Sequence, residues 1–261
     1  MRVAVTAGYS RSQHACAVIT LLERAGHEVV AVNVVRAFTP KRARGYVRQL
    51  GVKKAAARLQ QRYQKSAATA EVRPVSDFCA TNKITSSSVT DCAEAVGATI
   101  TVTSNLNADD SLEALRGKDL DLIIYAGGGI LRQPLLDIPK IGTLNAHAGP
   151  LPDIRGMNSS EWALLKGQVP EITTILVERG VDTGPIVRRH PIDGQPAASI
   201  EHLRGLATVA SIKAIVADVD HLATNPNLEK QDTTVGRQYF VMAQPLVDLL
   251  DGALAKSRQR P

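Results

Sequence analysis

Short apolar runs alternate with amphipathic segments along the first part of the chain. RVAVT at the amino terminus and EVVAVNVV from residue 28 are rich in β-branched residues, which favours strands. Between them, a helical pattern extends from about Arg11 to Ala25 and stops at Gly26, the residue type that most often follows a helix. A strand, a helix and a second strand in this order predict two parallel strands joined by a right-handed crossover.

The same alternation continues towards the middle of the chain. A helix is expected from about Ser88 to Val96, before Gly97, and the strand ATITVT follows it. Asn107 and Asp110 have the spacing of a helix cap in front of LEALRG. DLDLIIYAGG is typical of a fully buried strand, because its apolar residues occur together and glycines end the run. We therefore expect an α/β protein with a doubly wound, mostly parallel, Rossmann-like sheet.

Two further strands and a long helix complete this pattern. KIGTLNAH and ITTILVE have strand character, and WALLKG between them is helical. SIEHLRGLATVASIKAIVADVDHLAT has the apolar spacing of a helix that packs on a sheet. We expect a catalytic domain over residues 1–220, with a basic helical insertion at about 36–73. Residues 221–261 would form a short tail that is a candidate for a helix or a homodimer contact.

Composition excludes several classes of protein. No apolar run reaches the roughly 18 residues of a membrane span, and the amino terminus MRVAVTAGYSRS is strand-like, unlike a signal peptide. Cys16, Cys79 and Cys92 lack the CxxC spacing of a thiolate zinc site and do not suggest a disulfide frame. The turn AGYSRS lacks the G-x-G-x-x-G spacing that binds a dinucleotide pyrophosphate. We expect a cytoplasmic protein without a membrane anchor, a metal or NAD.

The net charge of +6 is concentrated in one segment. No acidic residue occurs between Glu28 and Glu71, whereas ten of the 31 lysines and arginines do. Such a segment can contact nucleic-acid phosphates, or it can be a solvated helix pair that attracts anionic ligands in general. The second interpretation is favoured, because the aromatic residues interleaved with these charges are only Phe38, Tyr46 and Tyr63.

Residues suited to chemistry occur at the ends of the later strands. Asn145 and His147 are two positions apart in KIGTLNAH, so they share one face of the strand. Three glycines follow the buried strand in YAGGGIL, and Asp182 lies between glycines in RGVDTGPI. Ligands of doubly wound sheets bind at the carboxyl ends of the strands, which directs attention to this edge. Taken singly, each of these residues is more often a turn or core residue than a catalytic one.

Together, YAGGGIL, LNAHAGPLPDIRG and GVDTGPIV resemble the folate-dependent formyltransferase family, which includes glycinamide ribonucleotide formyltransferase and the catalytic domain of methionyl-tRNA formyltransferase. The resemblance covers residues 1–205 as architecture and is specific from about Asp119 to Ile192. It implies that Asn145, His147 and Asp182 are the catalytic residues. The chain departs from the family at GPLP, where Ser-Leu-Leu-Pro is usual, and segment 36–73 has no counterpart in the small members.

The resemblance also implies the ligands. 10-Formyltetrahydrofolate would be the formyl donor, with its pterin beside the glycine loop and the loop before the aspartate, and no metal is required. The residues expected in the donor pocket are Gly129, Ile130, Leu131, Arg179, Gly180 and Val181. Arg155, Gly156 and Asn158 are expected to contact the acceptor, although they fit equally well a turn that caps the next helix. Glu161 and Trp162 are expected at the surface and in the core of that helix.

The three catalytic residue types suit formyl transfer to an amine. Attack on the formyl carbon creates an anionic oxygen and a protonated nitrogen together. The amide of Asn145 can donate a hydrogen bond to that oxygen, a contact worth roughly 100- to 1,000-fold in rate. His147 can donate to the same oxygen when protonated or accept the proton of the amine when neutral. Asp182 would hold the imidazole's protonation state and pass the proton on through water.

We therefore expect an enzyme that moves a formyl group from the reduced folate to a primary amine of a small molecule. An anionic acceptor would match the basic segment. Only about 40 residues follow the long helix, too few for the β-barrel of methionyl-tRNA formyltransferases, which argues against initiator tRNA. The alternatives are hydrolysis of the formylated folate by water, an RNA- or tRNA-acting protein that uses residues 36–65, and a folate-binding protein without activity.

Overall fold

The computed structural model of this chain describes residues 1–36, 73–86, 88–194, 196–225 and 227–257. The basic helical insertion predicted at about 36–73 therefore lies almost entirely outside the described residues. The strands and helices on either side of it are all described, and they determine the architecture.

A seven-stranded sheet lies at the centre of the molecule, in the order β3-β2-β1-β4-β5-β7-β8. Every pair of neighbouring strands from β3 to β5 in this order is parallel. β7 pairs antiparallel with β5, and β8 pairs antiparallel with β7. The predicted α/β fold with a doubly wound, mostly parallel sheet is confirmed. The strands are β1 (Arg2–Ala7), β2 (Glu28–Val35), β3 (Thr99–Thr103), β4 (Leu122–Ala126), β5 (Gly142–His147), β7 (Glu171–Leu176) and β8 (Ile186–Pro191).

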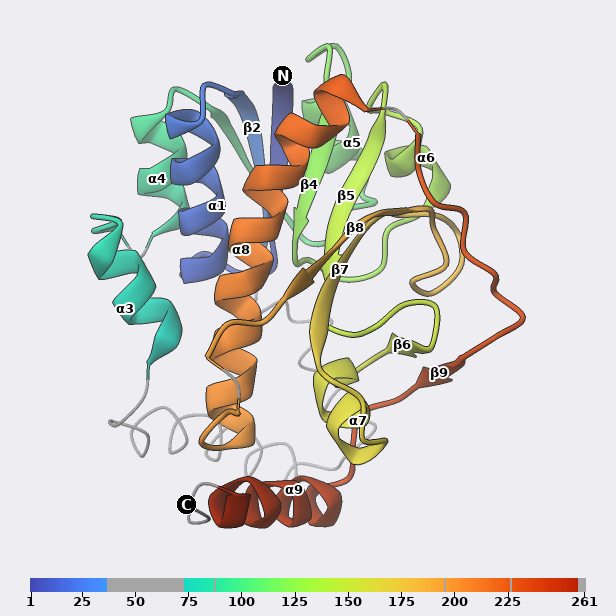
Figure 1. The fold of residues 1–261 in the computed structure, drawn as a ribbon. Helices are drawn as coiled ribbons and strands as arrows, with labels where there is room; N and C mark the ends of the chain where they lie inside the picture. Colours follow the sequence, from blue (N-terminus) through green and yellow to red (C-terminus); the bar gives the residue numbers. More distant parts are fainter. Residues whose placement is uncertain (37–72, 87, 195, 226, 258–261) are drawn as a thin grey trace, which may run out of the picture.

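Helices cover both faces of the sheet (Figure 1). α1, α3, α4 and α8 lie on one face, and α5 and α6 lie on the other. The described helices are α1 (Gln13–Arg24), α3 (Pro74–Thr81), α4 (Val89–Ala95), α5 (Asp109–Leu115), α6 (Gln133–Leu136), α7 (Ser159–Leu165), α8 (Ile200–Thr224) and α9 (Gln244–Ser257). Because β1, β2, β3, β4 and β5 run parallel to one another, their carboxyl ends meet at one edge of the sheet.

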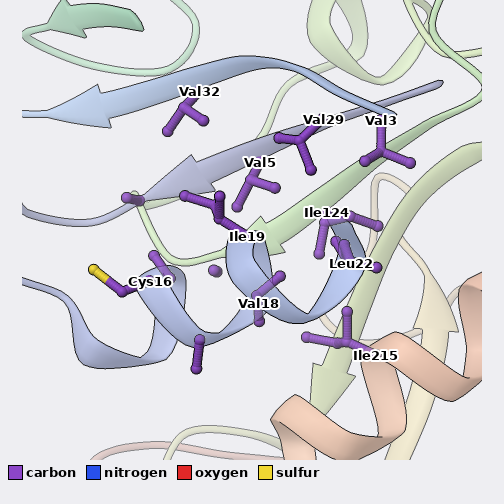
Figure 2. Packing of buried hydrophobic residues seen from close by; sticks show 14 of the residues in the cluster. Val3, Val5, Cys16, Val18, Ile19, Leu22, Val29, Val32, Ile124 and Ile215 are labelled. Atoms are coloured by element: carbon purple, nitrogen blue, oxygen red, sulfur yellow. The ribbon is translucent and has the colours of Figure 1, made fainter. Parts of the chain in front are cut away.

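The larger part of the core lies between the sheet and the helices α1, α4 and α8. Val5 and Ile124 of the sheet, Ile19 and Leu22 of α1, and Ile215 of α8 are all fully buried there, as Figure 2 shows. Burying a side chain of this size contributes roughly 1.5–3 kcal/mol. This packing fixes α1 and α8 against the sheet, and both helices contribute residues to the site described below.

The predicted cap of α5 is wrong in its residue. α5 begins at Asp109 after Ala108, which makes no side-chain cap bond. Asn107 instead donates to the carbonyl of Ile130 and accepts a hydrogen bond from the amide of Arg132, both at 2.8 Å. The asparagine therefore fastens the loop after β4, where the sequence suggested only a local cap.

The chain after α8 returns to the carboxyl edge of the sheet. β9 (Arg237–Tyr239) pairs in parallel with β6 (Ile154–Gly156) in a small second sheet. The ring of Tyr239 lies 4.9 Å from that of Trp162 in α7, and α9 packs against α7 and α8. Figure 1 shows α7, β6, β9 and α9 gathered at one end of the molecule.

Three features bear on the classes excluded by composition. Cys16, Cys79 and Cys92 are free and buried in the core. No group of three or more His, Cys, Asp or Glu side chains within the described ranges could hold a metal ion. No helix in the described part of the chain is both long and apolar enough to cross a membrane.

Candidate active site

Strand β5 carries Asn145 and His147 on one face of the sheet. Leu144 and Ala146 alternate with them and pack into the apolar clusters on the α8 side. His147 is 6% exposed, whereas Asn145 is only partly buried. The side-chain amide of Asn145 makes no hydrogen bond with any described residue, so its donors are available to a ligand.

His147 is held by two oxygen atoms. Its Nδ1 lies 3.3 Å from Oδ2 of Asp182, and its Nε2 lies 2.8 Å from the carbonyl oxygen of Ile154. Both partners are acceptors, so the ring donates through whichever nitrogen carries a hydrogen. A Cβ at Gly149 would lie 3.1 Å from Nε2 and 2.5 Å from Cβ of Ser159. A glycine after the Asn-x-His motif therefore leaves room for the imidazole.

Asp182 follows β7 in a loop that is fixed from two directions. Its φ of 53° is in the left-handed region, an uncommon conformation for a residue with a side chain. The amide of Gly156 donates to its Oδ2 at 2.8 Å, and Nε2 of Gln231 donates to its carbonyl oxygen at 3.1 Å. The carboxylate is thus held against the imidazole by a strand of the small sheet.

The three consecutive glycines after β4 form a second loop at this edge, each with positive φ. The hydroxyl of Tyr125 donates to the carbonyl of Gly129 and accepts from its amide. Gly128 has a φ of 133°, a conformation that residues with side chains rarely adopt, and a Cβ there would lie 2.4 Å from Cδ1 of Leu106. Burial, aided by the nearby carboxylate of Asp182, raises the pKa of Tyr125. The glycine loop and the aspartate loop are therefore neighbours.

The residues expected to bind the donor lie on these two loops. Ile130 is 85% exposed and Val181 is 46% exposed, whereas Leu131 packs on the core beneath α5 and α6. Arg179 and Gly180 are exposed beside Val181. None of the six expected donor residues lines the cavity described next.

A cavity of about 340 Å³ opens beside His147. Its walls come from the first turn of α1, the segment from β6 to α7, and α8. Gly156 and Asn158, two of the expected acceptor residues, line it. Arg155 does not: its guanidinium donates to the carbonyls of Thr233 and Val235 in the carboxyl-terminal segment.

Gly156 and Asn158, the two expected acceptor residues that line the cavity, also hold its structure. Gly156 has a φ of 97°, and a Cβ there would lie 2.1 Å from the carbonyl oxygen of Tyr239. Asn158 has a left-handed φ of 53°, and its Oδ1 accepts from the amide of Met242 at 3.0 Å. Its Nδ2 donates to Oε1 of Glu161 at 2.7 Å. Arg155 and Gly156 belong to β6 and not to a turn, and Asn158 precedes α7 without a side-chain cap bond.

The expectation that Glu161 lies at a helix surface is wrong. The residue is 2% exposed and lines the cavity, where Arg204 of α8 donates from Nε to its Oε1 at 2.7 Å. A carboxylate is rarely buried without such a partner. Arg204 is 43 positions further along the chain, so no local signal reveals the pair.

His14 is a second cavity residue that the sequence did not single out. The hydroxyl of Ser12 caps α1 by accepting from the amide of Ala15, which places His14 in the first turn at the carboxyl edge of the sheet. Its Nε2 is buried with no hydrogen-bond partner among the described residues. Burial lowers the pKa of His14 to about 4, so the ring is neutral near pH 7.

The fold is that of an α/β protein with a mostly parallel, doubly wound sheet, and comparison with known families makes the assignment specific. The chain belongs to the formyl transferase family, whose model matches residues 1–217. The resemblance inferred from the sequence is thereby confirmed.

Sequence relatives in this family are methionyl-tRNA formyltransferases. The one from Novosphingobium aromaticivorans is 33% identical over 172 residues, which cover 64% of this chain and 56% of the relative. The one from Thermodesulfovibrio yellowstonii is 35% identical over 101 residues, which cover 38% of this chain and 33% of the relative. The chain thus matches only about half the length, or less, of these relatives.

Solved structures of the family share the fold. Glycinamide ribonucleotide transformylase 1 from Symbiobacterium toebii has a TM-score of 0.57 at 18% identity, over 89% of this chain and 94% of that chain. A sugar N-formyltransferase from Shewanella sp FDAARGOS_354 has a TM-score of 0.56 at 10% identity, over 92% of this chain and 77% of that chain. At such identities the likeness concerns the fold alone.

Proposed function

We propose that this chain transfers the formyl group of 10-formyltetrahydrofolate to a primary amine of a small molecule, with Asn145, His147 and Asp182 as the catalytic residues. The observation that carries the proposal is the imidazole of His147, held 3.3 Å from the carboxylate of Asp182 beside a cavity. The amide of Asn145, with no protein partner, lies on the same face of the same strand. Membership of the formyl transferase family supports formyl transfer as the reaction.

Asn145 stabilises the charge that appears on the formyl oxygen. The bound folate would supply the formyl carbon, and attack by the amine makes its oxygen anionic. The amide nitrogen of Asn145 is free to donate to that oxygen, whereas its neighbours on the strand are held in the core. A fixed donor of this kind contributes roughly 100- to 1,000-fold to the rate.

His147 takes the proton that the amine loses. In this structure its Nε2 faces the carbonyl of Ile154, so proton transfer requires Nε2 to exchange that carbonyl for an atom of the acceptor. Asp182, held by the amide of Gly156, keeps its carboxylate on Nδ1 and stabilises the imidazolium that forms. The amine proton thus moves to His147 as the new carbon–nitrogen bond forms. When the bond between the formyl carbon and the folate nitrogen breaks, this proton would pass to the departing folate nitrogen.

The two exposed loops suit the folate donor. Gly129, held by the hydroxyl of Tyr125, has no side chain to obstruct a flat ring, and Ile130 and Leu131 follow it with apolar side chains. On the loop before the aspartate, Arg179, Gly180 and Val181 offer a second exposed stretch. Exposed apolar side chains such as Ile130 and Val181 are typical of ligand-binding surfaces when they occur together. We assign these six residues to the donor.

The cavity beside His147 suits a small acceptor. Small-molecule sites usually have volumes of roughly 300–1,000 Å³, and this cavity has about 340 Å³. Gly156 and Asn158 line it, and we assign them to the acceptor side. Arg155 supports the wall through the carboxyl-terminal segment.

A screen for formylated products tests the proposal. The protein would be incubated with isotopically labelled 10-formyltetrahydrofolate and a panel of primary amines, and mass spectrometry would detect the gain of one labelled formyl group. We include methionyl-tRNA, because the sequence relatives named above act on it by name. Folate binding without any formylated amine would contradict the proposal, and loss of the formyl group to water alone would favour a hydrolase.

A further inference from the structure

The acceptor cavity contains a buried carboxylate that is bonded through only one of its oxygens. Oε1 of Glu161 accepts from Asn158 at 2.7 Å and from two nitrogens of Arg204, at 2.7 and 2.6 Å. Oε2 accepts no hydrogen bond from any described residue. The residue is 2% exposed, and it lines the cavity. Its second oxygen is therefore a hydrogen-bond acceptor that the fold itself does not use.

A purely structural role does not explain this arrangement. The side chain of Arg204 is 48% exposed, so water could satisfy the guanidinium without any buried partner. Burying a carboxylate in order to pair it with a solvated arginine usually costs more free energy than the pair returns. The burial of Glu161 is easier to explain if its carboxylate also serves a ligand.

The charges around the cavity define the chemistry of that ligand. Glu161 and Arg204 carry opposite charges, and Arg204 is the one lysine or arginine among the described residues that line the cavity. His14, whose Nε2 has no hydrogen-bond partner among the described residues, is neutral near pH 7. The described walls therefore present no excess positive charge to an anion, and they offer an anionic oxygen to a hydrogen-bond donor.

We propose that Glu161 is a recognition residue for the acceptor, whose Oε2 accepts a hydrogen bond from a hydroxyl or ammonium group next to the amine that is formylated. Arg204 and Asn158 hold the other oxygen and so fix the direction of the carboxylate. An acceptor with a phosphate or carboxylate at that position would meet a like charge and be rejected. This inference rests on the proposed function, because it places the acceptor in this cavity.

Three variants separate recognition from structural pairing. Glu161→Gln keeps the shape of the side chain and removes its charge. Glu161→Gln combined with Arg204→Gln removes the ion pair as a whole, so no arginine is left without its partner. Glu113→Gln makes the same chemical change at an exposed position of α5, on the opposite face of the sheet, and serves as the matched control.

Each variant would be assayed with labelled 10-formyltetrahydrofolate and a small-molecule extract of bacterial cells as the acceptor pool. The rate of appearance of each labelled product would be followed at increasing extract concentration, which gives an apparent KM and kcat. Folate binding and thermal unfolding would be measured alongside, to show that each variant is folded and binds the donor.

We expect Glu161→Gln to raise the apparent KM for the acceptor roughly 10- to 100-fold, as the loss of a hydrogen bond to a charged group does. Folate binding should be unchanged, and the double variant should remain as impaired as the single one. The inference is overturned if Glu161→Gln stays within about twofold of Glu113→Gln, or if the double variant regains the wild-type KM. If the wild-type protein yields no labelled amine at all, the proposed function fails instead.

Discussion

Three histidine–aspartate pairs occur in the described part of this chain, and two of them, His147–Asp182 and His190–Asp218, differ in what surrounds them. Nδ1 of His147 lies 3.3 Å from Asp182 at the carboxyl edge of the sheet. Nε2 of His190 lies 2.8 Å from Asp218, between β8 and α8. By distance alone, the second pair is the better formed.

The second pair is saturated with protein partners. Asp218 is 0% exposed, and its carboxylate accepts hydrogen bonds from Thr174, Arg188 and His190. Burial raises the pKa of Asp218, but the hydrogen bonds from His190 and Thr174 and the charges around it outweigh burial and hold the pKa below its usual value. This network ties α8 to β7 and β8, and both oxygens of the carboxylate accept hydrogen bonds from protein side chains.

The first pair is surrounded by unsatisfied groups. The side-chain amide of Asn145 and Nε2 of His14 make no hydrogen bond with any described residue, and Glu161 uses one oxygen only. All but the first of these line the same cavity as His147. The comparison teaches that a histidine–aspartate pair does not by itself mark a site in this fold. Polar groups without protein partners beside a cavity do.

The largest expected difference between the two pairs is in turnover. His147→Ala should lower kcat by roughly 100- to 10,000-fold, because it removes the group that takes the amine proton. His190→Ala should leave kcat per folded molecule close to that of the wild type, since His190 contacts no residue of the site. Steady-state formylation rates, corrected for the folded fraction, measure both. Folate binding by His147→Ala controls for a damaged site, and equal kcat values for the two variants would remove His147 from the proposed chemistry.

Stability should respond in the opposite order. Asp218→Ala should lower the free energy of unfolding by about 3 kcal/mol. This is the lower limit of the usual cost of removing one partner of a buried ion pair, because the remaining partners Arg188 and His190 reach solvent. Asp182→Ala should cost only about 1 kcal/mol, the contribution of an ordinary hydrogen bond. Urea unfolding of both variants measures the difference. Equal losses would show that Asp182 is as structural as Asp218.

The sheet and the shared face of Asn145 and His147 could be predicted from the sequence, because both depend on local patterns. Alternation of apolar residues in KIGTLNAH already places the two side chains on one face, and the structure shows the same alternation with Leu144 and Ala146. The glycine after the motif and the aspartate in a glycine loop were likewise visible as local signals.

The remaining walls of the cavity could not be predicted from local patterns. Glu161 is buried because α8 brings Arg204 back to it, and Asn107 leaves its expected cap because Ile130 lies within reach. Arg155 was assigned to the acceptor, but it donates to carbonyls 78 and 80 positions further along the chain. Each of these hydrogen bonds joins residues that are far apart in the sequence, so no local pattern of residues reveals it.

The contribution of Asn145 should be next in size. Asn145→Ala should lower kcat by roughly 100- to 1,000-fold with little change in the KM for either substrate, because the lost hydrogen bond strengthens only in the transition state. Asn227→Ala, at an exposed position, is the matched control and should behave as the wild type. A large rise in KM with unchanged kcat would show that Asn145 binds substrate without stabilising the charged oxygen.

The two regions should also differ in how their contribution to stability depends on pH. The folded-state pKa of His14, about 4, lies below its ordinary value of 6.5, so the unfolded chain binds a proton between these values that the folded protein does not. Stability is therefore fully present above pH 6.5 and falls as the pH is lowered towards 4, by at most roughly 1.4 kcal/mol per pH unit. Asp218, whose pKa is held below 3.8, contributes stability that is lost only at lower pH, as the pH falls through its folded-state pKa.

His14→Gln should weaken the loss of stability between pH 6.5 and 4, and Asp218→Asn should alter only the loss of stability at lower pH. Urea unfolding at a series of pH values tests both. If the free energy of unfolding of His14→Gln changes with pH between 4 and 6.5 as it does in the wild type, the folded protein does not lower the pKa of His14.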